Sequence, residues 1–97
     1  MTLRSGRKPK KSGQAVVLSR QPFNRKRRTV IVIPLSKAHT QTEWPLLIAV
    51  RTTGIGVAVI DQIKAADKSR FGSCLGRLSD EEMKQISEAV ACVLDVP

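Results

Sequence analysis

Aromatic side chains are scarce in this sequence. They make up 3% of the 97 residues, with one Trp, two Phe and no Tyr. Phe23, Trp44 and Phe71 are far apart along the chain. Domains that stack bases on a sheet need several aromatic side chains close together. The sequence therefore disfavours a base-stacking platform of the RRM or typical OB type.

Cysteine and histidine are also rare, with two residues and one residue respectively. Cys74 and Cys92 form no CxxC motif, and two cysteines are too few for a disulfide framework. His39 stands alone, and no cluster of metal-ligating residues accompanies either cysteine. We therefore expect two reduced thiols, a cytoplasmic location, and neither a metal site nor a cofactor.

Long apolar runs are absent. The longest, TVIVIPL, is far shorter than the ~18 residues that a membrane-spanning helix needs. The basic N-terminus is not followed by an apolar segment, so we expect no signal peptide. With 41% hydrophobic residues, the chain has enough apolar surface for one small domain.

Acidic residues are missing from the first 42 positions, which hold 11 of the 17 lysines and arginines. The rest of the chain has 6 basic and 8 acidic side chains. The net charge of +9 and the pI near 10.4 therefore come from the N-terminal half. A strongly basic segment of this kind indicates a polyanionic partner.

Residues 1–12, MTLRSGRKPKKS, are polar and basic and show no hydrophobic periodicity. This composition predicts a disordered basic tail. The alternative is an arm that contacts phosphates. We place the folded domain at residues 13–97.

After this tail, short apolar runs alternate with turn residues. They predict strands at 15–19, 29–36, 45–51 and 55–63, followed by a short helical turn within 64–72. Pro34, near the end of the second run, indicates an edge strand, a bulge or the end of pairing. Several short strands in succession favour a small twisted sheet or barrel.

The last segment, LSDEEMKQISEAVACVLDV, changes to helical periodicity. Ser79 and Glu82 form an S-x-x-E capping box, and Leu78 and Met83 occupy the positions of a hydrophobic staple. Acidic residues in the first turn suit the helix macrodipole. The apolar face comprises Met83, Ile86, Val90, Val93 and Leu94. We expect the helix to pack on the sheet and complete an α+β domain.

Four consecutive cations, Arg25 to Arg28, lie between the first two predicted strands. Most charge runs form solvated loops, and this is one interpretation of the segment. The other is contact with a phosphate backbone, because an anion offsets the repulsion between the cations and counterion release favours binding. Charge alone predicts no sequence-specific readout.

Asp61 stands within the apolar run VAVIDQI. Strand interiors are poor in Asp, and an unpaired buried carboxylate is costly. One interpretation is a structural ion pair at a strand end, with Lys64 or with a cation of the basic half. In the other interpretation, Asp61 is a carboxylate held beside cations at a phosphate site.

Two longer strings carry a resemblance to a known family. AVVLSRQPFNRKRRTVIVIPLS places an AVVLS strand, an FN loop and a strand ending in PLS in succession. RTTGIGVAVIDQIKAADKSRFGSCLGRLSDEEMKQI contains a DQI step and ends in the predicted helix. In this order, the motifs resemble those of the MazF/PemK (Kid) toxins of type II toxin–antitoxin systems. The resemblance covers roughly residues 13–96.

This resemblance implies an SH3-like (CcdB/PemK-like) twisted antiparallel sheet or barrel with a C-terminal α-helix. It implies a homodimer that cleaves single-stranded RNA without a metal or cofactor, as an mRNA interferase. A paired antitoxin with an acidic tail would neutralise it in the cytoplasm. The reaction would be attack of a ribose 2′-hydroxyl on the adjacent phosphate, which needs a base, a proton donor and cations.

The resemblance also implies roles for individual residues. Asp61 matches the aspartate of the DQ step and would be the general base or would organise the phosphate site. Ser36 would bind the scissile phosphate, and Lys11 or Arg20 would stabilise its charge. The residues implied in RNA binding are Arg20, Asn24, Arg25, Lys26, Arg27, Lys37, Thr52 and Thr53.

The sequence departs from the family in two places. Members usually begin with a strand of the RGDIWWVDLDP type and carry Arg-Pro just before PAVVLS, whereas Gly13 and Gln14 stand there in this chain. Val59 occupies the position of another arginine of the PemK/Kid branch. We therefore expect a chain without the usual first strand. The alternative to an active nuclease is an impaired member that binds nucleic acid or an antitoxin.

Overall fold

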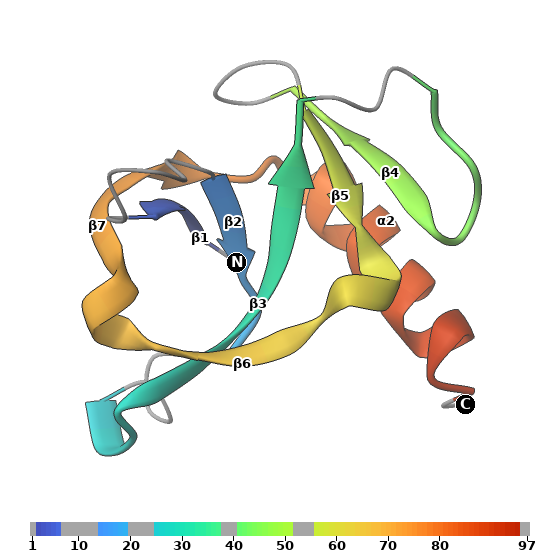
Figure 1. Ribbon diagram of the computed structural model, residues 1–97. Helices are drawn as coiled ribbons and strands as arrows, with labels where there is room; N and C mark the ends of the chain where they lie inside the picture. Colours follow the sequence, from blue (N-terminus) through green and yellow to red (C-terminus); the bar gives the residue numbers. More distant parts are fainter. Residues whose placement is uncertain (1, 7–13, 20–24, 38–40, 52–55, 96–97) are drawn as a thin grey trace.

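The computed structural model describes residues 2–6, 14–19, 25–37, 41–51 and 56–95 (Figure 1). Its strands are β1 (Thr2–Gly6), β2 (Gln14–Val17), β3 (Thr29–Ser36), β4 (Leu47–Val50), β5 (Gly56–Val59), β6 (Lys64–Asp67) and β7 (Phe71–Arg77). Its helices are the 3-10 turns η1 (Ile60–Gln62) and η2 (Lys68–Arg70) and the α-helix α2 (Asp80–Val93).

The strands form an antiparallel sheet in the order β4-β5-β3-β2-β1-β7, and β6 pairs with β3 outside this path. The end strands β4 and β7 are not paired with each other in the described part, so the sheet is open and twisted rather than a closed barrel. Helix α2 lies beside β4 and η1 (Figure 1). This arrangement confirms the predicted α+β fold with a C-terminal helix.

β3 is central to the sheet, and its bounds match the predicted strand. One edge pairs with β2, where Ile33 lies opposite Val16. The other edge pairs first with β6 and then, towards the end of β3, with β5. Val32 and Ile33 point to opposite faces of β3 and are both buried, because a cluster of apolar side chains covers each face there.

Three surplus residues separate β5 from β6. Leu35 of β3 lies opposite Ala58. Three residues earlier on β3, Val32 lies opposite Lys64, which follows Ala58 by six residues. The three extra residues form the 3-10 turn η1, which bulges from the edge of the sheet.

Pro34 lies beside this break. The backbone of Ile31 faces β2, because Leu18 N–H donates to Ile31 O (2.8 Å) and Ile31 N–H donates to Ser19 Oγ (3.0 Å). Backbone groups alternate between the two edges of a strand, so the nitrogen of Pro34 faces η1 instead. A residue without an N–H fits this position, since the ladder is interrupted there. Sequence analysis left an edge strand, a bulge or the end of pairing open for Pro34. Because β3 lies inside the sheet, the arrangement agrees with a bulge and not with an edge strand.

Two buried clusters occupy opposite faces of β3, as the alternation of side chains along a strand requires. The first lies under α2 and comprises Val16, Ile33, Ile48, Val50, Ala58, Ile60, Leu78, Ile86 and Ala89. The second comprises Ala15, Val17, Val30, Val32 and Ala66, with Phe71 packed against it. Burial of these side chains supplies the main driving force for folding.

Helix α2 begins as the sequence predicts. Ser79 Oγ accepts a hydrogen bond from Glu82 N–H (3.2 Å), and Glu82 Oε1 accepts one from Ser79 N–H (3.2 Å). Leu78 is buried, and Met83 packs against the same cluster. The predicted apolar face stops short of Leu94, whose side chain is 53% exposed.

The structure differs from the expected basic tail and from the expected lack of a first strand. Thr2–Gly6 forms β1, which pairs with β2 on one edge and with β7 on the other. The segment TLRSG has no strand-like apolar alternation, so its strand depends on hydrogen bonds to both neighbours. Residues 7–12 lie outside the described ranges.

Two further predictions are corrected. The strand predicted at 55–63 ends at Val59, because the three surplus residues that follow form the 3-10 turn η1. The helical turn predicted within 64–72 is present only as η2, and β6 and β7 flank it. The segment KAAD has little local preference for a strand. It forms β6 because it pairs with β3.

Candidate functional site

Asp61 lies on η1, and its side chain is exposed. The preceding residue, Ile60, is fully buried in the cluster under α2. The turn is thus anchored by Ile60 and presents the next side chain to solvent. Among the described residues, the Asp61 carboxylate forms no hydrogen bond or ion pair, including with Lys64. Because the Asp61 side chain is exposed, the fold does not carry the free-energy cost of a buried, unpaired carboxylate.

Ser36 is the last residue of β3 and is half-buried, and the adjacent Lys37 is exposed. Ser36 lies opposite Val57, near the start of β5. A Cβ on Gly56 would lie in ordinary van der Waals contact with Leu35, 3.6 Å from its Cβ. The end of β3 is therefore held against the β4–β5 hairpin.

Asp61 and Ser36 lie at different heights along β3, at the edge of β3 that pairs with β5 and β6. The register places η1 beside Ile33 and Pro34, two to three residues before Ser36. At ~3.3 Å per residue, the two levels are roughly 7–10 Å apart. The backbones of η1 and Ser36 therefore lie at different heights along β3.

Arg51 adds another exposed cation at the Ser36 end of β3. It follows β4, whose last residue, Val50, lies opposite Gly56. The backbone N–H of Arg51 donates to Glu82 Oε2 at 2.6 Å, so α2 holds the end of β4 in place. Sequence analysis did not single out Arg51, although its position beside Thr52 was a usable signal.

Arg25, Lys26 and Arg27 are exposed and lie just before β3, at the end opposite Ser36 (Figure 1). β3 has 8 residues, which corresponds to about 23 Å from end to end. These three residues therefore cannot contact the same phosphate as Ser36 or Lys37.

A second basic segment lies beside this one. Lys68 N–H donates to Arg28 O at 2.8 Å, and Arg70 belongs to the same turn, η2. Asp67 Oδ1 caps η2 by accepting a hydrogen bond from Ser69 N–H at 2.8 Å. This hydrogen bond is the main reason why the pKa of Asp67 lies below its ordinary value of 3.8, and the charges of Arg28 and Arg70 lower it further.

Sequence analysis considered Arg28 only as part of the run of four cations, and it proposed no binding role for Lys68 or Arg70. The two segments that carry them are far apart in the sequence and meet only because β3 pairs with β6. The available signal was the second basic run, KAADKSR, which was weaker than NRKRR.

Five predicted site residues lie outside the described residues, so their roles stay predictions. They are Lys11, Arg20, Asn24, Thr52 and Thr53.

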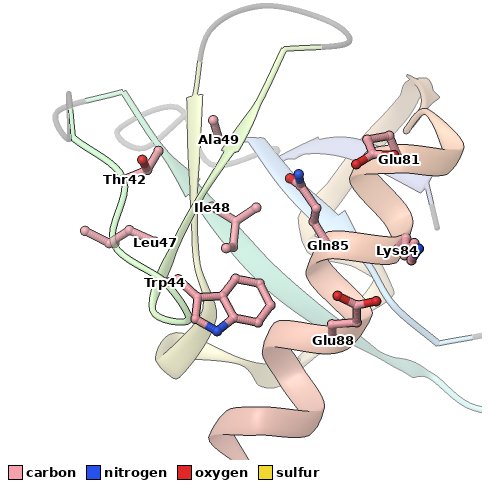
Figure 2. Close-up of a pocket in the computed structure, with 9 residues that line it drawn as sticks. All are labelled: Thr42, Trp44, Leu47, Ile48, Ala49, Glu81, Lys84, Gln85 and Glu88. Carbon is pink, nitrogen blue, oxygen red and sulfur yellow. The ribbon is translucent and has the colours of Figure 1, made fainter.

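A pocket of about 660 Å³ lies between α2 and the segment that leads into β4 (Figure 2). It is lined by Thr42, Trp44, Leu47, Ile48, Ala49, Glu81, Lys84, Gln85 and Glu88. None of the predicted site residues lines it. The negative charges of Glu81 and Glu88 exceed the positive charge of Lys84, so the pocket repels phosphate groups. The pocket also lies apart from the basic residues at the two ends of β3.

Metal ligation finds no support in the described part of the chain, where no three His, Cys, Asp or Glu side chains form a group that could hold an ion. Cys92 is a free and exposed thiol. No helix in the described ranges has the length and apolar character needed to span a membrane.

Comparison with known families gives one match over almost the whole chain. The sequence model of the PemK-like, MazF-like toxins of type II toxin–antitoxin systems matches residues 2–94. The match begins within β1 and ends at the last turn of α2. No curated protein matches the sequence significantly.

Several solved structures share the fold. An endoribonuclease from a Mycobacterial species, in complex with its cognate antitoxin, is 21% identical with a TM-score of 0.85, covering 99% of this chain and 93% of that one. Mycobacterium tuberculosis toxin MazF-mt6 is 16% identical with a TM-score of 0.84, covering 100% and 99%. A MazE–MazF complex from Deinococcus radiodurans (Form-II) is 16% identical with a TM-score of 0.85, covering 99% and 93%. At these identities, the likeness shows the fold alone.

Proposed function

Since this chain belongs to the family of PemK-like, MazF-like toxins of type II toxin–antitoxin systems, we propose that it cleaves single-stranded RNA as a metal-independent endoribonuclease. The family match over residues 2–94 carries this proposal. The exposed position of Asp61 supports it, because a general base must reach a substrate hydroxyl. The excess of positive charge supports an RNA substrate.

The reaction is an internal transfer. A ribose 2′-oxygen attacks the adjacent phosphorus, the bond to the 5′-oxygen breaks, and a 2′,3′-cyclic phosphate forms. The departing 5′-oxygen takes up a proton from a donor group or from water and leaves as a hydroxyl. Asp61 takes the proton of the 2′-hydroxyl, or organises the phosphate site, and Ser36 binds the phosphate. Lys11 or Arg20 stabilises the developing negative charge. A base and a phosphate ligand on opposite sides of one nucleotide suit the roughly 7–10 Å between the levels of Asp61 and Ser36.

The RNA strand approaches the Ser36 end of the sheet. Lys37 and Arg51 are the exposed cations among the described residues there, and they offset phosphate charge. Thr52 and Thr53, which follow Arg51 in the sequence, bind the RNA in the same proposal. Arg20, Asn24, Arg25, Lys26 and Arg27 complete the proposed RNA-binding residues.

A paired antitoxin with an acidic tail neutralises the toxin in the cytoplasm, and the toxin acts as a homodimer. Structural relatives support the antitoxin, since the Mycobacterial endoribonuclease is in complex with its cognate antitoxin and the Deinococcus MazF with MazE. Exposed large apolar side chains, which Ile31, Trp44, Leu46 and Leu94 provide, support association with another chain. Light scattering after size exclusion would give the oligomeric state.

Incubation with single-stranded RNA in the presence of EDTA tests the proposed activity. We expect cleavage by the unmodified chain and a loss of about 10²–10⁴-fold in rate for Asp61→Asn. Asp95→Asn is the matched control, since Asp95 is an exposed carboxylate at the far end of α2 with φ 55°, which Asn tolerates. RNA with 2′-O-methyl groups throughout should resist cleavage, because it lacks the attacking hydroxyl.

The result separates the two functions that the sequence allows. Equal rates for the unmodified chain and Asp61→Asn would remove Asp61 from catalysis. Salt-sensitive binding of RNA that stays intact under all conditions would contradict the nuclease and favour a non-catalytic binding module.

A further inference from the structure

Two basic segments converge at the start of β3, at the end remote from Ser36 (Figure 1). We call them together the Arg28–Lys68 cluster, which comprises Arg25, Lys26, Arg27, Arg28, Lys68 and Arg70. All of these side chains are exposed except that of Lys68, which is half-buried. The hydrogen bond from Lys68 N–H to Arg28 O fixes the two segments side by side.

The cluster places like charges next to each other. Thr29 pairs with Asp67, so Arg28 and Lys68 follow as directly opposite positions. Like charges in opposite positions of a strand pair destabilise it. Asp67 is the carboxylate in the cluster, and a single negative charge cannot neutralise six cations. A bound polyanion would remove the remaining repulsion.

The chemistry of the cluster favours a phosphate backbone over an acidic peptide. Most modes of peptide recognition use apolar pockets or a free strand edge beside the charges. Here Phe71 packs against the second buried cluster, and the edge of β6 that faces Arg28 is hydrogen-bonded to β3. Phosphate contacts need positive charge alone.

The cluster cannot belong to the cleavage site itself. From Arg28 to Ser36, the chain advances eight residues along one strand, or about 26 Å. At about 3.4 Å per nucleotide in a stacked strand, this distance corresponds to seven or eight nucleotides, and to fewer in an extended one.

We propose that the Arg28–Lys68 cluster binds RNA phosphates several nucleotides away from the cleaved bond and so makes longer RNA bind more tightly. This inference rests on the proposed RNA substrate but not on cleavage. Binding at the cluster is independent of base sequence, because it involves the backbone alone.

Binding of fluorescent single-stranded RNA of 6 and 20 nucleotides tests the proposal, with 2′-O-methyl groups throughout to prevent cleavage. We expect the 20-mer to bind more tightly than the 6-mer. Lys68→Gln with Arg70→Gln should reduce this preference about tenfold and lower the salt slope of 20-mer binding by about 1.4, since each lost phosphate contact in single-stranded RNA accounts for about 0.7. Affinity for the 6-mer should not change.

Arg77→Gln with Lys84→Gln is the matched control, because it removes the same charge from exposed sites outside the cluster. Equal loss of 20-mer binding in both double variants would overturn the proposal, since it would reflect net charge alone. Loss of binding to a poly-glutamate peptide with unchanged binding of the 20-mer would overturn it in favour of an acidic protein partner. If the unmodified chain cleaves no RNA but shows the cluster-dependent length preference, the proposed nuclease fails and this inference stands.

Discussion

The Glu82 carboxylate connects α2 to the end of β4. Its Oε2 accepts a hydrogen bond from Arg51 N–H at 2.6 Å, while its Oε1 accepts one from Ser79 N–H at 3.2 Å. One side chain therefore caps the helix and holds the backbone next to Thr52 and Thr53. The helix N-terminus thus takes part in shaping the Ser36 end of the sheet.

Glu82→Ala should destabilise the fold by about 1–3 kcal/mol, because it removes half of the capping box and leaves Arg51 N–H without its acceptor. Urea unfolding followed by circular dichroism measures this loss. Glu88→Ala is the control, since Glu88 is an exposed residue in the middle of the same helix. A loss of the same size in both variants would show that the Arg51 contact has no special weight.

Pro34→Ala should change the free energy of unfolding by less than about 1 kcal/mol, because the nitrogen of residue 34 faces the break at η1. Lys64→Pro should cost about 1–3 kcal/mol, because Lys64 pairs with Val32 and its side chain is exposed. Lys64→Ala isolates the backbone effect from the loss of the side chain. A large cost for Pro34→Ala would contradict the assignment of its nitrogen to the break.

Lys37→Gln and Arg51→Gln should each weaken binding of uncleavable single-stranded RNA and lower the salt slope by about 0.7. Stability should stay the same, since Arg51 contacts Glu82 through its backbone. Fluorescence anisotropy at salt concentrations between roughly 50 and 300 mM measures the dependence of RNA affinity on salt. Lys84→Gln, at an exposed position of α2 that lines the acidic pocket, should leave the slope nearly unchanged, and an equal decrease there would argue against a site at the Ser36 end.

Asp67 should make stability depend on pH in acid. Its folded pKa is lowered, chiefly by the hydrogen bond from Ser69 N–H, so its contribution is complete above the ordinary pKa of 3.8 and is lost as pH falls through the folded value. Asp67→Asn keeps an acceptor for Ser69 but has no charge. The difference in melting temperature between the two proteins should therefore be largest above pH 3.8 and vanish in stronger acid. A difference that does not depend on pH would contradict this.

Local sequence signals predicted those elements whose stability is mainly local or strongly patterned. The β-branched run 29–36 has the bounds of β3, and the S-x-x-E motif forms the predicted capping box of α2. Both depend on side chains close in sequence and on the burial of one apolar run. The uneven distribution of charge is likewise a property of the sequence alone.

Strand pairing decided what the sequence left open. TLRSG becomes β1 because two neighbouring strands supply its hydrogen bonds, and no local pattern indicates that. Asp61 is exposed because the register of β5 and β6 against β3 leaves three surplus residues, which a one-dimensional pattern of apolar residues does not reveal. The same pairing brings Lys68 beside Arg28. Contacts between residues distant in sequence are fixed by tertiary packing, so composition and periodicity determine the kind of fold and its charge, and the three-dimensional register determines where the charges act.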